Sequence, residues 1–251
     1  MKSVQQIGRS LHQLHGHDLV TGRAKYGTDY RLKGILYGKV KRSPYPHALI
    51  KSVDLAKALR LPGVRAVISG RDLQQKNPHG SVSIGVHDNQ LLARERVRYV
   101  GEPIVAVAAE SLETAEEAME AIEISYEPLE SLFDPKRSLG PNQEVKLHPE
   151  ILQYDVTGKK PFYPRLEPDM PNVSAYLRIR HGNMEDGMKR ADLTVENTFT
   201  LPRVQHLHLE PISSIAQATG EEVSIIASTQ EVEVRDLVAE ALSMGPSKVK
   251  L

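Results

Sequence analysis

A histidine-rich stretch in the second half of the chain is the most obvious candidate for chemistry. His206, His208 and Glu210 alternate with leucines, and on a β-strand this spacing would place all three side chains on one face. Imidazole and carboxylate groups are common ligands of zinc and iron. Because three nearly collinear ligands do not complete a tetrahedral set, we favour a polar strand face or a supporting role over a metal site. A metal hydrolase that uses these three residues is a weaker alternative.

Two further polar groupings could bind ions. His12, His15 and His17 lie in the polar N-terminal stretch, where we expect solvated imidazoles and assign no metal site. Arg94, Arg96 and Arg98 alternate and could together hold an anion. We favour an exposed polar face for these arginines.

The signatures of several enzyme classes are absent from the sequence. The chain contains neither a GxGxxG nor a GxxxxGK[ST] phosphate loop, and it has no GxSxG nucleophile turn. It has no cysteine, which excludes disulfides, thiolate zinc sites and iron–sulfur clusters held by this chain itself. Residue types and spacing alone therefore indicate no activity.

The elements that must position these residues fall into two groups. In the first group, alternating and continuous apolar runs predict strands, and Ser111 predicts the start of a helix whose apolar stripe follows helical spacing. The apolar run 104–109 predicts a strand covered on both faces. The expected strands are 35–42, 48–54, 64–68, 104–109 and 122–126, and the expected helices are 56–61 and the one after Ser111.

A proline-rich stretch separates the two groups. Seven prolines fall within residues 135–171, which argues against regular structure over most of that range and favours an ordered, extended connection. The second group has expected strands at 176–180, 193–201, 212–218 and 223–228, and expected helices at 184–191 and 232–242. A further strand is expected to begin at 249–251, so the second unit is expected to be unfinished.

Composition indicates a soluble protein. The 251 residues carry 32 Lys and Arg against 32 Asp and Glu, so the net charge of zero argues against nucleic acid or an anionic membrane as the main partner. No apolar run is long enough to span a bilayer, and the N-terminus lacks the apolar core of a secretory signal. We therefore expect a cytoplasmic protein of the α+β class.

Several segments, in order, resemble the opening of the large subunits of xanthine dehydrogenase/aldehyde oxidase-type molybdenum hydroxylases. The most distinctive is the run Val97–Val107, which contains Gly101-Glu102-Pro103. The others share the family's order along the chain: Ile7–Ser10, Val20–Tyr26, Arg42–Pro44, Leu61–Val64, Tyr126–Leu129, Gln205-His206, Leu209–Pro211 and Ser228–Gln230. The resemblance runs from about Ile7 to Leu251, so chance is a poor explanation.

The resemblance implies a domain layout. Residues 1–18 would be a polar N-terminal arm, 19–134 the family's α/β hammerhead domain and 135–174 the proline-rich connection. Residues 175–251 would be an incomplete first molybdopterin-binding domain.

The resemblance also implies a chemistry. Members of the family hydroxylate an electron-poor carbon of a purine, aldehyde or N-heterocycle at a molybdenum–molybdopterin cofactor, with water as the oxygen source. Electrons leave through iron–sulfur clusters to FAD, which we expect on other domains or subunits. Gln230 stands where the family has a glutamine whose amide contacts an oxygen ligand of the metal. We therefore assign Gln230 as the catalytic and cofactor-binding residue and assign no residue as a direct metal ligand.

Departures from the family pattern leave two main hypotheses. The family's GGxFG loop, expected soon after Leu251, and its glutamate base are missing, and His181-Gly182-Asn183 and Glu231-Val232-Glu233 differ from the usual wording. We therefore expect one part of a molybdenum hydroxylase that is inactive without the remaining molybdopterin domain and the iron–sulfur and flavin parts. The alternative is a non-catalytic binding or assembly module on a hammerhead scaffold.

Overall fold

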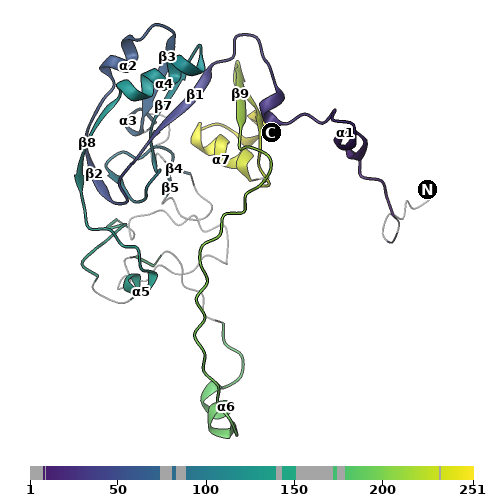
Figure 1. The fold of residues 1–251 in the computed structure, drawn as a ribbon, viewed down its shortest axis with the longest axis vertical. Helices are drawn as coiled ribbons and strands as arrows, with labels where there is room; N and C mark the ends of the chain where they lie inside the picture. Colours follow the sequence, from purple (N-terminus) through teal and green to yellow (C-terminus); the bar gives the residue numbers. More distant parts are fainter. Residues whose placement is uncertain are drawn as a thin grey trace.

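The computed structural model describes residues 8, 10–73, 81–82, 89–139, 143–150, 172–173, 179–231 and 233–251. These residues form two units of mixed helix and sheet, joined by a connection and preceded by a projecting N-terminal arm (Figure 1). None of the helices in these ranges is both long and apolar enough to cross a bilayer.

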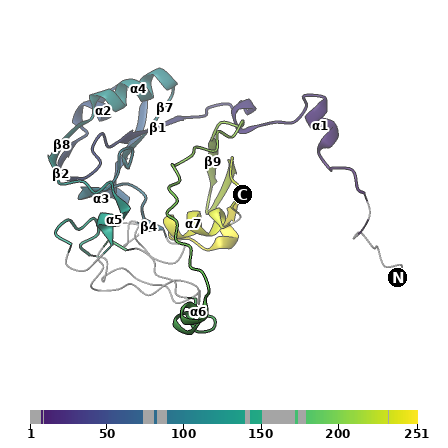
Figure 2. The same cartoon turned by 60° about the horizontal axis from the view of Figure 1, so that its bottom comes forward.

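The first unit is built on two three-stranded sheets, with strand orders β1-β7-β3 and β6-β2-β8. Helices α2 and α4 lie side by side over the first of these sheets (Figures 1 and 2). The strands are β1 (Tyr37–Arg42), β2 (Ala48–Asp54), β3 (Val64–Ser69), β6 (Arg96–Val97), β7 (Pro103–Ala109) and β8 (Glu123–Pro128). Two further short strands, β4 (Ser81–Val82) and β5 (Asn89–Gln90), pair antiparallel with each other. The helices are α2 (Ala56–Arg60), α3 (Gly70–Leu73) and α4 (Leu112–Ala121).

The core of this unit lies around β7, the middle strand of its sheet. Ile104 and Val105 point to opposite faces of the strand, and both are 0% exposed, so both faces are covered. This confirms the strand predicted from the apolar run.

Helix α4 packs on that sheet because of its start and its apolar stripe. The side chain of Ser111 accepts a hydrogen bond from the Thr114 backbone N–H, which satisfies one of the free donors of the first turn. Ala115, Ala118 and, just after the helix, Ile122 are buried. The predicted cap and stripe are both confirmed.

The connection is held at residues 143–150 by hydrogen bonds within itself and by Arg98 of the first unit. A short helix, α5 (Pro135–Ser138), begins it and is capped by the Asp134 side chain. Further on, the Asn172 amide accepts from the Leu147 N–H at 2.9 Å and donates to the Val145 carbonyl at 2.7 Å. These bonds support the prediction of an ordered connection, whereas its segment 151–171 lies outside the described residues.

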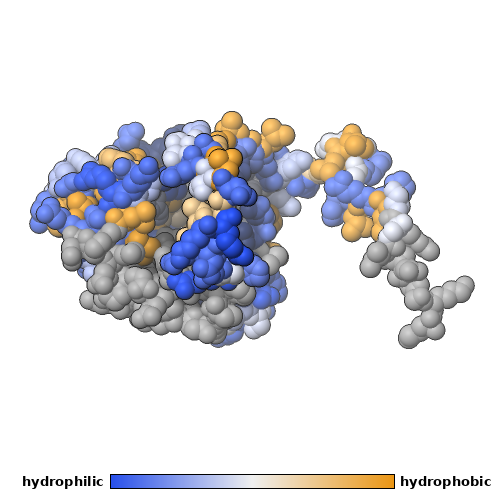
Figure 3. All heavy atoms as spheres, turned by 90° about the horizontal axis from the view of Figure 1, so that it is seen from below, coloured by the Kyte–Doolittle hydropathy of each residue, from blue (hydrophilic) through white to orange (hydrophobic). Residues whose placement is uncertain are grey.

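The N-terminal arm projects away from both units (Figures 1 and 3). The sequence predicts a polar and irregular arm over 1–18, but a short helix, α1 (Gly16–Val20), begins within it. Hydrophobic and hydrophilic side chains are mixed on its surface, and Leu14 and Val20 are among the most exposed apolar residues. After it, the 3-10 turn η1 (Gly27–Asp29) returns the chain to the second unit.

The second unit is a small sheet with order β11-β10-β9 that carries one longer helix. Strands β9 and β10 form an antiparallel hairpin, whereas β11 pairs parallel to β10. Its elements are α6 (Met184–Arg190), β9 (Ser214–Thr219), β10 (Glu222–Ala227), α7 (Val234–Ala241), the 3-10 turn η3 (Pro246–Lys248) and β11 (Val249–Lys250).

Two strands were predicted before β9, and neither is observed as a strand among the described residues. The strand predicted at 193–201 is wrong: the chain there is extended but pairs with no strand among the described residues (Figure 1). Its apolar side chains face solvent, with Phe199 84% and Leu201 89% exposed. Alternation predicts that a segment can form a strand, but a strand also needs a partner for its backbone groups. The strand predicted at 176–180 lies mostly outside the described residues.

Candidate functional site

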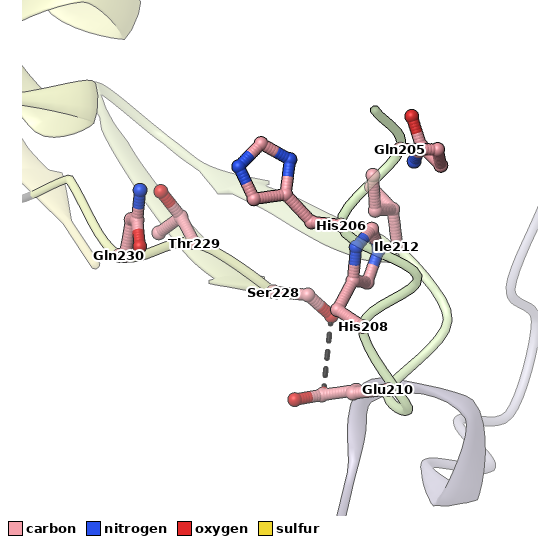
Figure 4. A pocket seen from close by; sticks show the side chains of 8 residues that line it. All are labelled: Gln205, His206, His208, Glu210, Ile212, Ser228, Thr229 and Gln230. Atoms are coloured by element: carbon pink, nitrogen blue, oxygen red, sulfur yellow. Dashed lines mark hydrogen bonds between the residues drawn. The ribbon is translucent and has the colours of Figure 1, made fainter. Parts of the chain in front are cut away.

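A pocket of about 560 Å³ lies at the end of the β9–β10 hairpin. Two segments line it: Ser228, Thr229 and Gln230, which follow β10, and the stretch before β9. Figure 4 shows Thr229 and Gln230 on one side and the His206 and His208 rings reaching in from the other. The pocket is lined by Gln205, His206, His208, Glu210, Ile212, Ser228, Thr229 and Gln230.

Gln230 lies where the chain leaves the sheet and turns towards α7. Strand β10 ends at Ala227 and α7 begins at Val234, so the expected place between a strand and a helix is confirmed. The Thr229 hydroxyl accepts a hydrogen bond from the Glu231 N–H at 3.1 Å, which forms a local turn around Gln230. The neutral Gln230 amide is exposed and lines the pocket, where it can donate and accept hydrogen bonds.

The opposite wall differs from the predicted strand face. Residues 201–208 form no strand, and Leu207 has a φ of 50°, in the left-handed region, so strict alternation fails there. His206, His208 and Glu210 nevertheless line the same pocket. Within the described ranges, no group of three or more His, Asp or Glu side chains could hold a metal ion. The metal-hydrolase hypothesis gains no support.

Glu210 is engaged by the protein itself. The Ser228 hydroxyl donates to Glu210 Oε1 at 3.1 Å, the bond drawn in Figure 4. A Cβ added to Gly27 would overlap the Ser213 hydroxyl and come within 3.7 Å of Ser228 Oγ, so η1 lies directly against this corner. Sequence reasoning missed Ser228 and Gly27: Ser228 is adjacent to Gln230 in a recognisable motif, but nothing in the sequence singles out Gly27.

The three alternating arginines do not share an anion site. Arg94 pairs with Glu95, and Arg96 donates to the buried His47 ring at 2.9 Å. The Arg98 side chain is only 9% exposed, pairs with Glu150 and donates to the Leu147 carbonyl at 3.0 Å. The prediction of an exposed polar face is therefore wrong for Arg98, because its guanidinium binds the connection.

Comparison with known proteins identifies both units. Residues 21–130 match the aldehyde oxidase and xanthine dehydrogenase a/b hammerhead domain, and residues 166–251 match the molybdopterin cofactor-binding domain. The chain belongs to the xanthine dehydrogenase/aldehyde oxidase family. The expected α/β hammerhead fold and the expected start of a molybdopterin-binding domain are confirmed.

Relatives of this family extend well beyond the matched region. The chain is 37% identical over 201 residues to a probable xanthine dehydrogenase subunit of Bacillus subtilis, a match that covers 80% of the chain and 24% of that protein. It is 30% identical over 258 residues to the nicotinate dehydrogenase large molybdopterin subunit of Eubacterium barkeri, covering 100% and 54%. The chain thus spans between about a quarter and about half of the length of these two relatives.

Solved structures of the family have the same fold. Quinoline 2-oxidoreductase from Pseudomonas putida 86 matches with a TM-score of 0.74 and 26% identity, over 98% of this chain and 30% of that one. Aldehyde oxidoreductase from Desulfovibrio gigas matches with the same TM-score at 23% identity, over 94% and 25%. The second likeness shows the fold alone.

Proposed function

We propose that this chain is part of a molybdenum-dependent hydroxylase that oxidises a purine, an aldehyde or an N-heterocycle with water as the oxygen source. The observation that carries this proposal is the position of Gln230: it lines the pocket directly after β10, in the part of the chain that matches a molybdopterin cofactor-binding domain. Partner subunits or domains with iron–sulfur clusters and FAD would accept the electrons.

The pocket has the size and chemistry to fit part of the cofactor. Its volume of about 560 Å³ lies within the range of small-molecule sites. Amides, hydroxyls and imidazoles line it, and its carboxylate, Glu210, already accepts a hydrogen bond from Ser228. Such groups can hydrogen-bond both to a pterin ring and to oxygen ligands of a metal. When bound, the molybdenum cofactor would supply the redox chemistry that transfers oxygen from water to the substrate.

In this proposal Gln230 binds the cofactor and polarises one of the oxygen ligands of its metal. Its amide N–H groups would donate to an oxygen ligand of molybdenum without adding charge, as the family resemblance implies. The backbone turn made by Thr229 and Glu231 holds the residue at the pocket wall. A preorganised neutral donor of this kind favours charge that develops during a reaction more than charge in the ground state.

The names of the similar proteins favour a heterocyclic substrate. Xanthine, nicotinate and quinoline occur in three of them, and each is a purine or another N-heterocycle, whereas aldehyde occurs in others. All three substrate classes therefore belong in the first assay.

The direct test is to co-express the chain with the adjacent reading frames and purify any complex. We expect molybdenum in that complex by mass spectrometry, and dehydrogenase activity on at least one purine, aldehyde or N-heterocycle. A complex that lacks both molybdenum and activity would contradict the proposal. A stable, partner-free monomer with a cooperative melt would favour the binding or assembly module instead.

Substitution of Gln230 tests its role within that complex. We expect Gln230→Ala to lower kcat/KM by roughly 10²-fold, the usual cost of removing one preorganised donor, with the complex still assembled. Gln217→Ala is the matched control, because Gln217 is an exposed glutamine on the neighbouring strand β9. Equal kcat/KM values for the two variants would exclude Gln230 from the site.

A further inference from the structure

The corner beside Gln230 is closed by a small set of hydrogen bonds at the end of the hairpin. Ser213 and Ser228 lie opposite each other just beyond the last ladder pair of β9 and β10, Ser214 and Ala227. The Ser228 N–H donates to the Ser213 carbonyl at 2.9 Å, and the Ser213 N–H donates to the Ser228 hydroxyl at 3.4 Å. The pairing of the two strands therefore continues one step further through a side chain.

The Ser228 hydroxyl has several possible partners but only one proton. Acceptors within reach are Glu210 Oε1 at 3.1 Å and the Pro211 carbonyl at 3.2 Å, and the Ser213 hydroxyl lies 3.4 Å away. A charged carboxylate is the strongest of these acceptors, and it is also the nearest. The proton therefore goes to Glu210, which leaves the lone pairs of Ser228 free to accept from Ser213.

Besides the ends of the two strands, a distant part of the sequence packs against this corner. Gly27, in η1, approaches Ser213 so closely that any Cβ there would overlap the Ser213 hydroxyl and lie 3.2 Å from its Cβ. Figure 4 shows a pale purple N-terminal segment passing beside Glu210. Solvent is thereby kept from one side of the serine pair, both members of which are partly buried.

Gln230 lies two residues after Ser228, and residues on both sides of it are held by hydrogen bonds. Before it, Ser228 is held by Glu210 and Ser213; after it, the Glu231 N–H is held by Thr229 Oγ1 at 3.1 Å. The backbone around Gln230 therefore has bonded groups on each side, while its own side chain remains free to enter the pocket.

We propose that Glu210, Ser213 and Ser228, closed by Gly27, form a clasp that positions the Gln230 amide in the pocket. Glu210 and Ser228 are thus positioning residues that act through Gln230. The inference rests on the proposed function of Gln230, but the clasp is a property of the chain itself and can be measured without cofactor.

The test is nuclear magnetic resonance on the full chain with Gln230 and its neighbours assigned. In Glu210→Ala and in Ser228→Ala, we expect the side-chain amide resonances of Gln230 to shift or split. We also expect the Ser228 and Glu231 backbone amides to exchange with solvent at least about tenfold faster, since a hydrogen bond to a charged group is lost. Glu210→Gln, which keeps an acceptor without the charge, should restore most of the wild-type pattern. Ser224→Ala is the matched control, an exposed serine on the same strand.

Two results would overturn the clasp. One is a lower melting temperature in Glu210→Ala and Ser228→Ala with unchanged Gln230 resonances, which would assign the residues a role in stability alone. The other is the same Gln230 shift in Ser224→Ala. If Glu210→Ala does not fold, Glu210→Gln tests the clasp instead. The proposal then requires the Glu231 amide of Glu210→Gln to exchange at a rate between those of wild type and Ser228→Ala. Failure of the proposed function would appear separately, as a cofactor-loaded complex that is indifferent to Gln230→Ala.

Discussion

Glu102 carries a carboxylate into the core of the first unit. It is 5% exposed, and its Oε2 accepts a short hydrogen bond from the Arg98 N–H. Burial raises the pKa of the Glu102 carboxyl above its usual value, because the hydrogen bond and the Arg98 charge only partly offset the loss of hydration. Glu102 belongs to Gly101-Glu102-Pro103, in the most distinctive run of the resemblance, and it has a structural role there that sequence alone does not indicate.

Glu102 predicts a pH dependence of stability. Because its pKa is raised in the folded state, the folded chain binds more protons than the unfolded chain above the ordinary pKa of glutamate, and stability is lost as pH rises through the raised value. We expect the free energy of unfolding of Glu102→Gln, relative to wild type, to increase as the pH rises above the ordinary pKa of glutamate. Urea unfolding at several pH values measures this difference. A flat difference for Glu102→Gln would contradict the assignment.

Among individual residues, the sequence suggests Gln230 as a site residue but does not indicate what surrounds it. A short motif, Ser228-Thr229-Gln230, and its order after other motifs were enough to select the glutamine. The clasp could not be predicted, since it joins Gly27 to Ser213 and Ser228 across most of the chain. His206, His208 and Glu210 line one pocket, but the left-handed Leu207 shows that they do so without the strand geometry that would have put them on one face.

At the scale of elements, sequence predicts best where local signals and tertiary partners agree. Ser111 with its apolar stripe predicted α4, and the continuous apolar run predicted β7, because both elements pack on each other in one core. Alternation at 193–201 predicted a strand that is absent, because among the described residues no strand pairs with it. A period of two describes side chains and carries no information about which strand supplies the hydrogen bonds.

The cap of α4 gives a prediction at this scale. Ser111→Ala removes the acceptor of the Thr114 N–H, and we expect the free energy of unfolding to fall by about 1 kcal/mol. Ser111→Asn, which can cap equally well, should retain nearly the wild-type value. Thermal or urea unfolding distinguishes them. Equal losses in both variants would show that the serine matters for a reason other than capping.

At the scale of the whole molecule, Arg98 attaches the connection to the first unit. The Arg98 backbone N–H donates to the buried Glu102 carboxylate. Its guanidinium binds the Leu147 carbonyl and the Glu150 carboxylate of the connection. Asn172, which is itself part of the connection, hydrogen-bonds to Val145 and Leu147 within it. The proline-rich composition predicted an ordered connection, but Arg98, which attaches it to the first unit, lies outside that stretch of the sequence.

This attachment predicts a change in protease sensitivity. Lys146 is exposed within the anchored stretch, so trypsin can cut after it once the stretch opens. We expect Arg98→Ala to speed that cut at least about tenfold, because charged hydrogen bonds that hold the stretch closed are lost. Arg65→Ala removes an exposed pair with Glu110 and should leave the rate unchanged. Mass spectrometry of timed digests measures both, and equal rates would show that other contacts hold the connection.

The contact of Gly27 with Ser213 also has a consequence for the order of folding. The β9–β10 hairpin joins segments that are adjacent in sequence, so it can form early and quickly. Gly27 and Ser213 are 186 positions apart in the sequence, so their contact closes a much longer loop, a step with a larger entropic cost. We therefore expect the N-terminal segment to dock beside the pocket only after the hairpin has formed.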